Sequence, residues 1–536
     1  MEKDRLLIKN GIVYDGLGGE PYQSDLLIMG DRIAAIGRID AADAQVIDAE
    51  GMVVCPGFVD IHRHCDVKPF IADSRLGVAE LSQGITTVVA GNCGFSMAPQ
   101  NPNRHQEAMD YVAPVLGEYP AGIEGIFSFK RYMDVLETKT LPFNMAAMIG
   151  TGAVRISLKG FANTPFTQGE MAKARRTVEE AMQVGAAGAS VGIMYIPECY
   201  GNAKEFAQML EPVGRYQGVV TAHIRGEGDS LTASVREIIN IGKMADCPVH
   251  ISHFKSCGAN NWRREIHKAI ELIEAARAMG QDVTCDFYPY DGGSTTLATM
   301  LPPEFVNGDF SGTLERLGTR KGVEAFRIAS LKQYDDWDNY VLTLGWDRII
   351  ISGVAQARNG RYLGMSVEAA AKAAGFVDGA ACAAHLLHDE AGKVAIIIMS
   401  MCQEDIDTVA ALPYSMVVSD AIYGQSSTPH PRMYGAFPKI IREYVHERGV
   451  YTLEEAIRRM TDCPARRMNL HKRGRLATGF YADVNIFDPA ELRDNATYTD
   501  STRLATGLRR CIVNGRVAKE NERIYSMDSG VVIRPH

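Results

Sequence analysis

The stretch Cys55-Pro-Gly-Phe-Val-Asp-Ile-His-Arg-His-Cys-Asp66 contains the pattern that decides the fold. An apolar run, residues 52–61, is followed by His62 and His64. Because successive side chains of a β-strand alternate between its faces, we expect both imidazoles on one side, where they could bind a divalent metal. Pro56-Gly57 predicts the turn by which the chain enters this strand. The same pattern also fits a surface strand with two incidental histidines, so other candidate ligands must decide.

The length, composition and net charge of the chain limit the classes of protein to which it can belong. Its 536 residues predict a large core domain and an accessory one, and 46% hydrophobic with 23% charged residues is typical of a soluble globular protein. The net charge of −9 argues against a nucleic-acid partner. No signal peptide or bilayer-spanning run is present, and eleven cysteines without framework spacing indicate free thiols. We therefore expect a cytoplasmic location and no membrane partner.

Both ends of the chain have the pattern of short strands separated by turns. Residues 6–54 alternate around turns expected at Asn10-Gly11 and Gly30-Asp31, and residues 479–517 follow the same style. We expect one composite β-sandwich domain, built from residues 1–54 and 471–536.

The middle of the chain, residues 55–470, alternates apolar strands with amphipathic helices. Eight candidate strands are expected at 52–62, 86–92, 143–149, 187–194, 218–224, 248–253, 282–288 and 414–419. Helices are expected between them at 169–184, 203–216, 230–244 and 263–279. This alternation predicts a closed (β/α)₈ TIM barrel. A doubly wound open sheet is the second interpretation, which the lack of a GxGxxG after an early strand disfavours.

Residues 290–400 disturb the regular alternation. They contain a Pro302-Pro303 break, a charged helical stretch, and the apolar runs 348–352 and 394–399. We expect most of this segment to be an insertion over the barrel mouth. Whether one of the two runs is itself a barrel strand stays open from the sequence.

The ends of the predicted strands carry residues that bind metals or transfer protons. They are His62, His64, Cys93, His223, His253 and Asp420. Active-site residues of TIM barrels come from the carboxyl ends of several strands, and one metal site explains this recurrence better than six coincidences. Imidazole, thiolate and carboxylate together suit zinc. A catalytic zinc keeps one position open for water and lowers its pKa to ~7, and a nearby carboxylate can move the proton.

Several of these segments together resemble the N-acyl-D-amino-acid deacylases (D-aminoacylases) of the amidohydrolase superfamily. The segments are Pro-Gly-Phe-Val-Asp-Ile-His-Arg-His, Gly-Asn-Cys-Gly, Ala-His-Ile-Arg-Gly-Glu, Ile-Ser-His-Phe-Lys, Tyr-Pro-Tyr-Asp-Gly-Gly-Ser-Thr and Ser-Asp. The resemblance runs nearly end to end and includes His430-Pro-Arg-Met-Tyr-Gly-Ala-Phe-Pro438. The HxH pattern specifies only the superfamily, whereas the Asn-Cys-Gly and Ser-His-x-Lys segments are more specific.

The resemblance implies a zinc-dependent hydrolase of linear amide bonds, with a small-molecule N-acyl-D-amino acid as substrate. It implies one tight zinc site at Cys93, His223 and His253, a second, weaker half-site at His62 and His64, and Asp420 as general acid/base. The substrate-binding residues that it implies are Arg432 for the α-carboxylate, Lys255, Tyr288 and Ser294 as helpers, and Tyr195 near the acyl carbonyl. An arginine suits this role because its guanidinium binds a carboxylate through two parallel hydrogen bonds.

Four positions depart from the pattern of the family. Thr151 and Phe254 stand where the family has histidine, Ala421 where it has glycine, and Cys65 where an acidic residue is frequent. None is an expected metal ligand, but together they leave the substrate preference open. Two other functions also stay open: a cyclic-amide hydrolase of the hydantoinase or dihydropyrimidinase type, disfavoured because Met194-Tyr195 rather than lysine end strand four, and a non-catalytic, metal-braced binding protein. Oligomeric state is not determined by the sequence.

Overall fold

The segment that enters the barrel is two strands rather than one. The computed structural model describes residues 5–41, 43–72, 75–120, 123, 125–306, 309–334, 337–424 and 428–535. Within them, β5 (Val53–Pro56) pairs with β1 (Arg5–Val13) and β18 (Val484–Phe487), whereas β6 (Phe58–Asp60) pairs with β7 (Ile85–Ala90). The prediction of a single strand over 52–62 was therefore wrong. Its two halves belong to different sheets.

Gly57 is the residue between these two strands. Its backbone N–H donates to the Asp483 carbonyl at 2.9 Å, and a Cβ at this position would overlap the side chain of Thr86 on β7. Only glycine lets the chain pass this close to the barrel strand, so the predicted Pro56-Gly57 turn is a change of sheet.

The barrel is closed and parallel, as predicted. Among the described residues its strands follow the order β6, β7, β8 (Asn144–Ala147) with β9 (Ile149–Gly150), β10 (Gly188–Gly192), β11 (Val219–His223), β12 (Val249–Ile251), β13 (Val283–Phe287) and β17 (Ser415–Val417). A parallel bridge between Arg63 and Ala421 joins the last strand to the first. The closed ring excludes the open doubly wound sheet.

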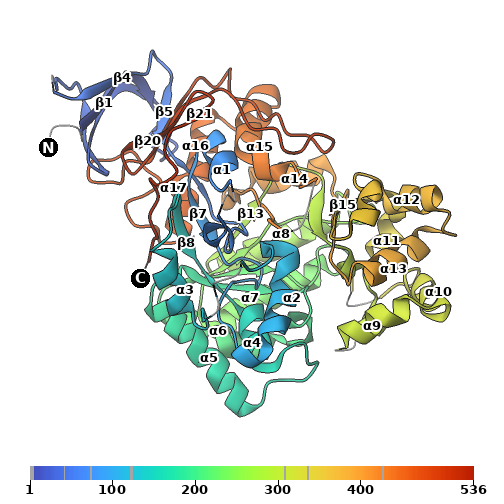
Figure 1. Ribbon diagram of the computed structural model, residues 1–536. Helices are drawn as coiled ribbons and strands as arrows, with labels where there is room; N and C mark the ends of the chain where they lie inside the picture. Colours follow the sequence, from blue (N-terminus) through green and yellow to red (C-terminus); the bar gives the residue numbers. More distant parts are fainter. Residues whose placement is uncertain are drawn as a thin grey trace.

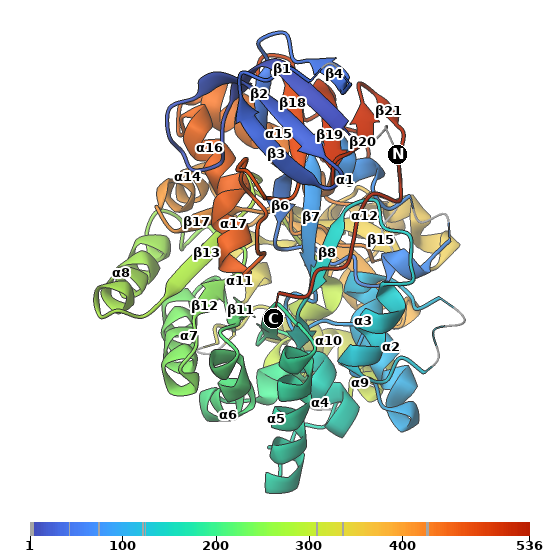
Figure 2. The same ribbon diagram turned by 90° about the vertical axis from the view of Figure 1, so that its left-hand side faces the viewer.

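The helices expected between the central strands form where the pattern placed them. They are α5 (Gln168–Gln183), α6 (Ala203–Arg215), α7 (Leu231–Ala245) and α8 (Glu265–Ala278), and they lie outside the strands in Figure 2. Thr167 and Glu170 form a capping box at the start of α5, and the Asn202 side chain accepts from two backbone N–H groups of α6. Buried alanines, valines and isoleucines on the inner side of each helix cover the barrel.

Both ends of the chain contribute to one nine-stranded sheet. β1, β2 (Tyr22–Met29), β3 (Arg32–Gly37), β4 (Gln45–Asp48) and β5 join β18, β19 (Leu508–Val513), β20 (Arg516–Glu520) and β21 (Arg523–Ile524). They share one apolar core, and Figure 1 shows them beside the barrel. The Gly30-Asp31 turn is confirmed, but Asn10-Gly11 is a bulge inside β1, with Asn10 at φ 57°, so the turn predicted there was wrong.

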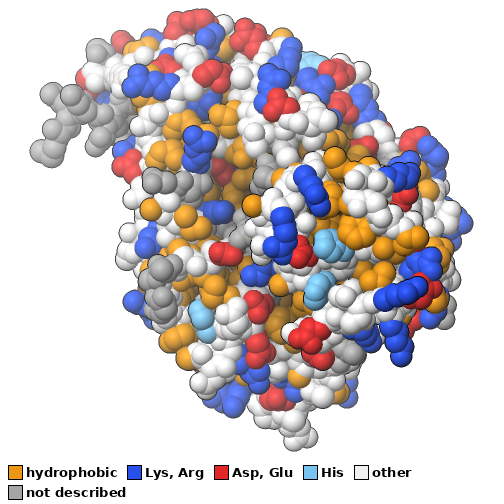
Figure 3. All heavy atoms as spheres, turned by 45° about the vertical axis from the view of Figure 1, so that its right-hand side comes forward, with side chains coloured by type: hydrophobic (Ala, Val, Ile, Leu, Met, Phe, Trp, Pro, Cys, Tyr) orange, Lys and Arg blue, Asp and Glu red, His pale blue; other side chains and the backbone are white. Residues whose placement is uncertain are grey.

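The insertion forms a separate layer, seen at the right of Figure 1. β14 (Gly293–Thr296), β16 (Val394–Ile398) and β15 (Ile349–Val354) make a three-stranded antiparallel sheet, so neither apolar run is a barrel strand. Helices α9 (Phe310–Leu317), α10 (Arg320–Ala329), α12 (Val367–Ala374) and α13 (Gly379–Asp389) surround it. Basic and acidic side chains are interspersed on the face in Figure 3. Among the described helices, none is long and apolar enough to cross a membrane.

We predict that Gly57→Ala lowers the free energy of unfolding by about 1–3 kcal/mol, because the added methyl group overlaps Thr86. Urea denaturation measures this loss. Gly19→Ala is the matched control, since nothing lies within 4 Å of a Cβ there. Adding Thr86→Ala to Gly57→Ala should recover at least ~0.5 kcal/mol relative to additivity. Strict additivity would contradict the overlap.

Candidate metal centre

The two histidines of the HxH segment lie just beyond β6, at the carboxyl end of the barrel. They are not strand residues, which corrects the expectation, but their rings still lie near each other, with centroids 5.4 Å apart. Arg63 between them is fully buried. Its guanidinium pairs with Asp60 at 3.1 Å and Glu80 at 2.7 Å. This buried ion pair points Arg63 away from both imidazoles and fixes the segment.

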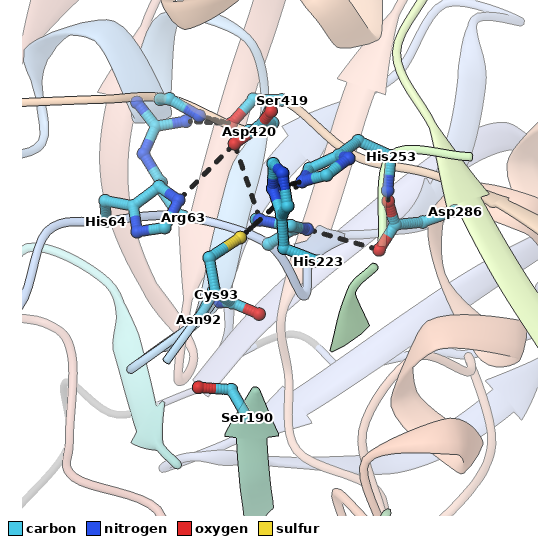
Figure 4. Close-up of polar contacts among 12 residues, drawn as sticks. Arg63, His64, Asn92, Cys93, Ser190, His223, His253, Asp286, Ser419 and Asp420 are labelled. Atoms are coloured by element: carbon cyan, nitrogen blue, oxygen red, sulfur yellow. Dashed lines mark hydrogen bonds and ion pairs between the residues drawn. The ribbon is translucent and has the colours of Figure 1, made fainter. Parts of the chain in front are cut away.

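Cys93 lies in the turn that follows β7. Its backbone has φ 55°, the left-handed region, and neighbouring side chains hold the turn: Asn92 donates to the Val89 carbonyl at 2.9 Å, and Ser190 accepts from the Gly94 N–H at 2.9 Å. The Cys93 Sγ lies 3.2 Å from His62 Nε2. Figure 4 shows the thiol turned toward the histidines.

His223 ends β11 and His253 follows β12 at φ 36°. The His223 Nδ1 and His253 Nε2 atoms are 2.8 Å apart, and Cys93 Sγ lies 3.6 Å from that same His253 nitrogen. Burial alone would raise the pKa of the Cys93 thiol, but the cationic field of His62 and the imidazoles of His223 and His253 lower it well below its usual range. A buried thiolate facing imidazoles is the state that binds a metal.

Three overlapping groups of potential metal ligands occur among the described residues. They are His62, His64 and Cys93; Cys93, His223 and His253; and His62, His253 and Asp420, and within each group the ligand atoms all lie within 4.8 Å of one another. The sets of one thiolate and two imidazoles suit zinc. Cys93 belongs to two of them, so one sulfur could serve both half-sites.

Asp420 lies just beyond β17 in the left-handed region, at φ 49°. Its Oδ1 is 3.4 Å from both His62 Nε2 and His64 Nε2, and its Oδ2 is 2.9 Å from an Arg432 terminal nitrogen. Burial acts to raise the pKa of this carboxyl, but the Arg432 guanidinium and the His62 imidazole hold it well below its usual range. The carboxylate is therefore ionised and able to accept a proton.

Glu227 and Asp286 were not among the expected site residues, yet both contact the histidines. Glu227 Oε1 lies 2.9 Å from His253 Nδ1. Asp286 accepts from the His253 backbone N–H and lies 3.4 Å from His62 Nδ1. Such carboxylate partners fix the tautomer and direction of a ligand imidazole. Asp286 lies one residue before the end of β13, a position like those of the expected ligands, and this signal could have found it. Glu227 lies four residues beyond the end of β11, in the segment that His223 begins.

The side chains expected to bind substrate surround the same space. Tyr195, Lys255, Tyr288, Ser294 and Arg432 all line one cavity of about 590 Å³, together with Cys93 and Asp420. The Tyr195 hydroxyl lies 3.4 Å from His223 Nδ1, and the Arg432 guanidinium carbon lies 4.4 Å above the Tyr288 ring. Ser294 belongs to β14 of the insertion, which forms one wall of this cavity.

The departures from the family pattern have different surroundings. Thr151 begins α4 (Thr151–Lys159), where its hydroxyl donates to the Ser190 carbonyl at 3.0 Å and contacts the Glu198 carboxyl. Phe254 is buried in the apolar core, and Ala421 makes the backbone bridge to Arg63. Burial raises the pKa of the Cys65 thiol well above its usual range, so this cysteine stays protonated, unlike Cys93.

Comparisons with known proteins agree with this site. A model of the amidohydrolase family matches residues 45–225 and 402–518. D-aminoacylase of Alcaligenes xylosoxydans xylosoxydans is 32% identical over 532 residues, which cover 98% of this chain and 97% of that protein. This chain belongs to the N-acyl-D-amino-acid deacylases of the amidohydrolase family.

Solved structures of these deacylases have the same fold. That of the N-acyl-D-glutamate deacylase from Bordetella bronchiseptica, complexed with zinc and a phosphonate inhibitor that mimics the tetrahedral intermediate, superimposes with a TM-score of 0.84 at 29% identity, covering 99% of this chain and 100% of that one. A D-aminoacylase whose structure was solved to study its binuclear metal centre superimposes with a TM-score of 0.80 at 28% identity. The match covers 98% of this chain and 99% of that one. Dihydropyrimidinase of Brevibacillus agri is similar in fold alone, with a TM-score of 0.56 at 14% identity. That match covers 99% of this chain and 98% of the other.

We predict that Cys93→Ala loses most of the bound metal, because this sulfur belongs to two ligand groups. Cys285→Ala is the control, since Cys285 is an equally buried thiol within β13. His64→Ala should keep the metal of the Cys93, His223 and His253 group. Metal content per chain, measured on dialysed samples, distinguishes these outcomes. Full retention of metal by Cys93→Ala would contradict the ligand assignment.

Proposed function

We propose that this enzyme hydrolyses N-acyl-D-amino acids to a carboxylic acid and a free D-amino acid. The observation that supports this most directly is the arrangement of Asp420. Its carboxylate lies between the candidate metal ligands His62 and His64 on one side and Arg432 on the other. A proton-transferring group thus stands between a metal site and a carboxylate-binding cation, as hydrolysis of an N-acyl amino acid requires.

We further propose one tightly held zinc at Cys93, His223 and His253 and a second, weaker metal at His62 and His64. The convergence of buried thiolate and imidazole atoms supports both half-sites. When bound, zinc would supply Lewis acidity toward water and the acyl carbonyl. Glu227 and Asp286 support the assignment, because they orient His253 and His62 as carboxylate partners of metal-binding histidines do.

In this proposal the protein's own residues handle the proton and the substrate. Asp420 takes a proton from the attacking water and gives it to the departing nitrogen, because an amide anion is too basic to leave. Tyr195 donates to the oxygen of the former carbonyl as its negative charge develops. Arg432 binds the α-carboxylate, with Tyr288 and Ser294 beside it. Lys255 stands in the same wall, but its ammonium is already paired with Glu227 at 2.5 Å.

The cyclic-amide hydrolase alternative loses support at its own key position. Such an enzyme normally bridges two metals with a carbamylated lysine at a strand end, and β10 is followed by Met194-Tyr195 instead. Among the described residues that line the cavity, Lys255 is the one lysine, and Glu227 pairs with it. A non-catalytic, metal-braced scaffold is disfavoured because more candidate ligands converge than a closed four-ligand shell needs.

Amine release from paired N-acetyl-D- and N-acetyl-L-amino acids tests the function, with zinc content measured on the same sample. We expect release from N-acetyl-D-methionine and N-acetyl-D-leucine but not from the L enantiomers. Asp420→Asn should lower kcat at least about a hundredfold while zinc stays bound, because it removes the proton-transfer group. Loss of zinc in that variant would instead make Asp420 a ligand. Zinc without release from any pair would refute the deacylase proposal.

Arg432→Met should raise KM for N-acetyl-D-methionine at least about tenfold, because the α-carboxylate loses its cationic partner. The matched control is N-acetyl-D-methioninamide, which lacks that carboxylate. Wild-type enzyme should prefer the free acid over the amide, and the variant should lose this preference. An unchanged ratio of kcat/KM for the two compounds would contradict carboxylate binding by Arg432.

A further inference from the structure

Two adjoining cavities converge on Arg432. The central cavity, of about 590 Å³, has Cys93 and Asp420 in its wall. The side cavity, whose space of about 420 Å³ includes solvent at its mouth, is lined by Pro114 of α2 (His105–Leu116) and Met433 of α15 (Arg432–Lys439), and also by the polar residues Ser294, Thr295 and His430. The residues common to both walls are Val115, Ser294, Thr295, Ile422 and Arg432. A molecule bound at Arg432 therefore has access to both spaces.

The charge of Lys255, the lysine in the wall of the central cavity, is balanced by a buried carboxylate. Lys255 Nζ lies 2.5 Å from Glu227 Oε1, and 2.7 Å from both the backbone oxygen and the Nδ1 of His253. Both partners of the Lys255–Glu227 pair are buried. The Glu227 carboxylate and the His253 carbonyl accept from two of its three N–H groups, and the carboxylate balances the charge of the ammonium. A substrate carboxylate at Lys255 would have to displace Glu227, which also orients His253.

Both ring nitrogens of His430, the histidine in the wall of the side cavity, have hydrogen-bond partners. His430 Nε2 lies 2.9 Å from the Gly292 carbonyl oxygen, and His430 Nδ1 accepts from the Arg432 backbone N–H at 3.1 Å. Donation to a carbonyl on one side and acceptance from an N–H on the other fix a neutral tautomer. Burial and the Arg432 guanidinium also lower the pKa of His430 well below its usual range. This ring has no donor left for an anion.

Arg432 is the remaining cation among the described residues that line either cavity. One of its terminal nitrogens faces Asp420 at 2.9 Å, and its Nε and Nη1 have no hydrogen-bond partner among the described residues. Each of these two groups can donate a hydrogen bond to a substrate carboxylate. The acids in the walls, Glu227 and Asp420, would repel a second one.

We infer that the enzyme selects substrates with a neutral, apolar D-side chain, seated in the side cavity, and rejects acidic side chains. This rests on the proposed function, since it assigns Arg432 to the α-carboxylate. The carbonyl end of the substrate must face Cys93, His223 and His253, so the amino-acid end lies where the two cavities meet. Beyond that junction the wall offers Pro114, Met433 and Ala395, which suit an apolar group. Apart from Arg432, no described residue of this wall is a cation that could pair with a side-chain carboxylate.

A panel of N-acetyl-D-amino acids tests the inference. We expect kcat/KM for D-methionine and D-leucine to exceed that for D-glutamate at least about a hundredfold, because an unpaired charge is costly to bury. The neutral isostere D-glutamine should exceed D-glutamate at least about tenfold, which separates charge from size. Equal rates on D-glutamate and D-methionine would overturn the inference and leave the deacylase function standing. No release from any D substrate would overturn the proposed function itself.

Met433→Lys tests where the side chain lies, with Met433→Leu as the matched control. A cation placed in the side cavity should raise the ratio of kcat/KM for D-glutamate over D-glutamine at least about tenfold, and leucine should leave that ratio unchanged. The ratio is insensitive to a general loss of active enzyme. Ile422→Lys, in the same wall, is the second variant if Met433→Lys does not fold. An unchanged ratio in the folded lysine variant would place the side chain elsewhere.

Discussion

The backbone closure between the first and last barrel strands is the constraint on which the rest of the structure depends. Asp420 N donates to the His62 carbonyl at 3.0 Å, and His64 N donates to the Ala421 carbonyl at 3.0 Å. These bonds close the ring and place the Asp420 carboxylate against both imidazoles of the HxH segment. The buried Arg63, paired with Asp60 and Glu80, holds the intervening residue in the wall. The candidate metal ligands His62 and His64 and the carboxylate of Asp420 are therefore positioned by the same closure.

The charges of the site are matched in pairs, and this pairing connects stability with specificity. Glu227 neutralises Lys255, Asp420 faces Arg432, and Asp286 serves His62 and His250. Buried charges are tolerated because each has a partner. In the proposed function, this pairing leaves the guanidinium of Arg432 as the place for one additional carboxylate. An enzyme that processes substrates with two carboxylates would need a further free cation in this space.

Much of the fold could be predicted because its signals are local. Strand and helix periodicity predicted the barrel and helices α5, α6, α7 and α8. The pattern of short strands and turns at the two chain ends predicted the composite β-domain. The errors occurred where packing between distant segments decides. The strand over 52–62 divides at Gly57 because its first half pairs with β18, more than 400 residues away in sequence. Asn10-Gly11 became a bulge because β2 continues past it.

The sequence by itself determined which residue types stand at the strand ends, and so the candidate ligands His62, His64, Cys93, His223 and His253 and the acid Asp420. Their chemistry follows from side-chain type and from their places at or just beyond the carboxyl ends of strands. Only the tertiary structure decided which hydrogen-bond donors and charges of the site already have partners within the protein. Lys255 was expected to help bind a carboxylate, and in the structure it donates to the Glu227 carboxylate and to the His253 carbonyl. Hydrogen-bond partners are set by distances between separate strands, and no local pattern in the chain encodes them.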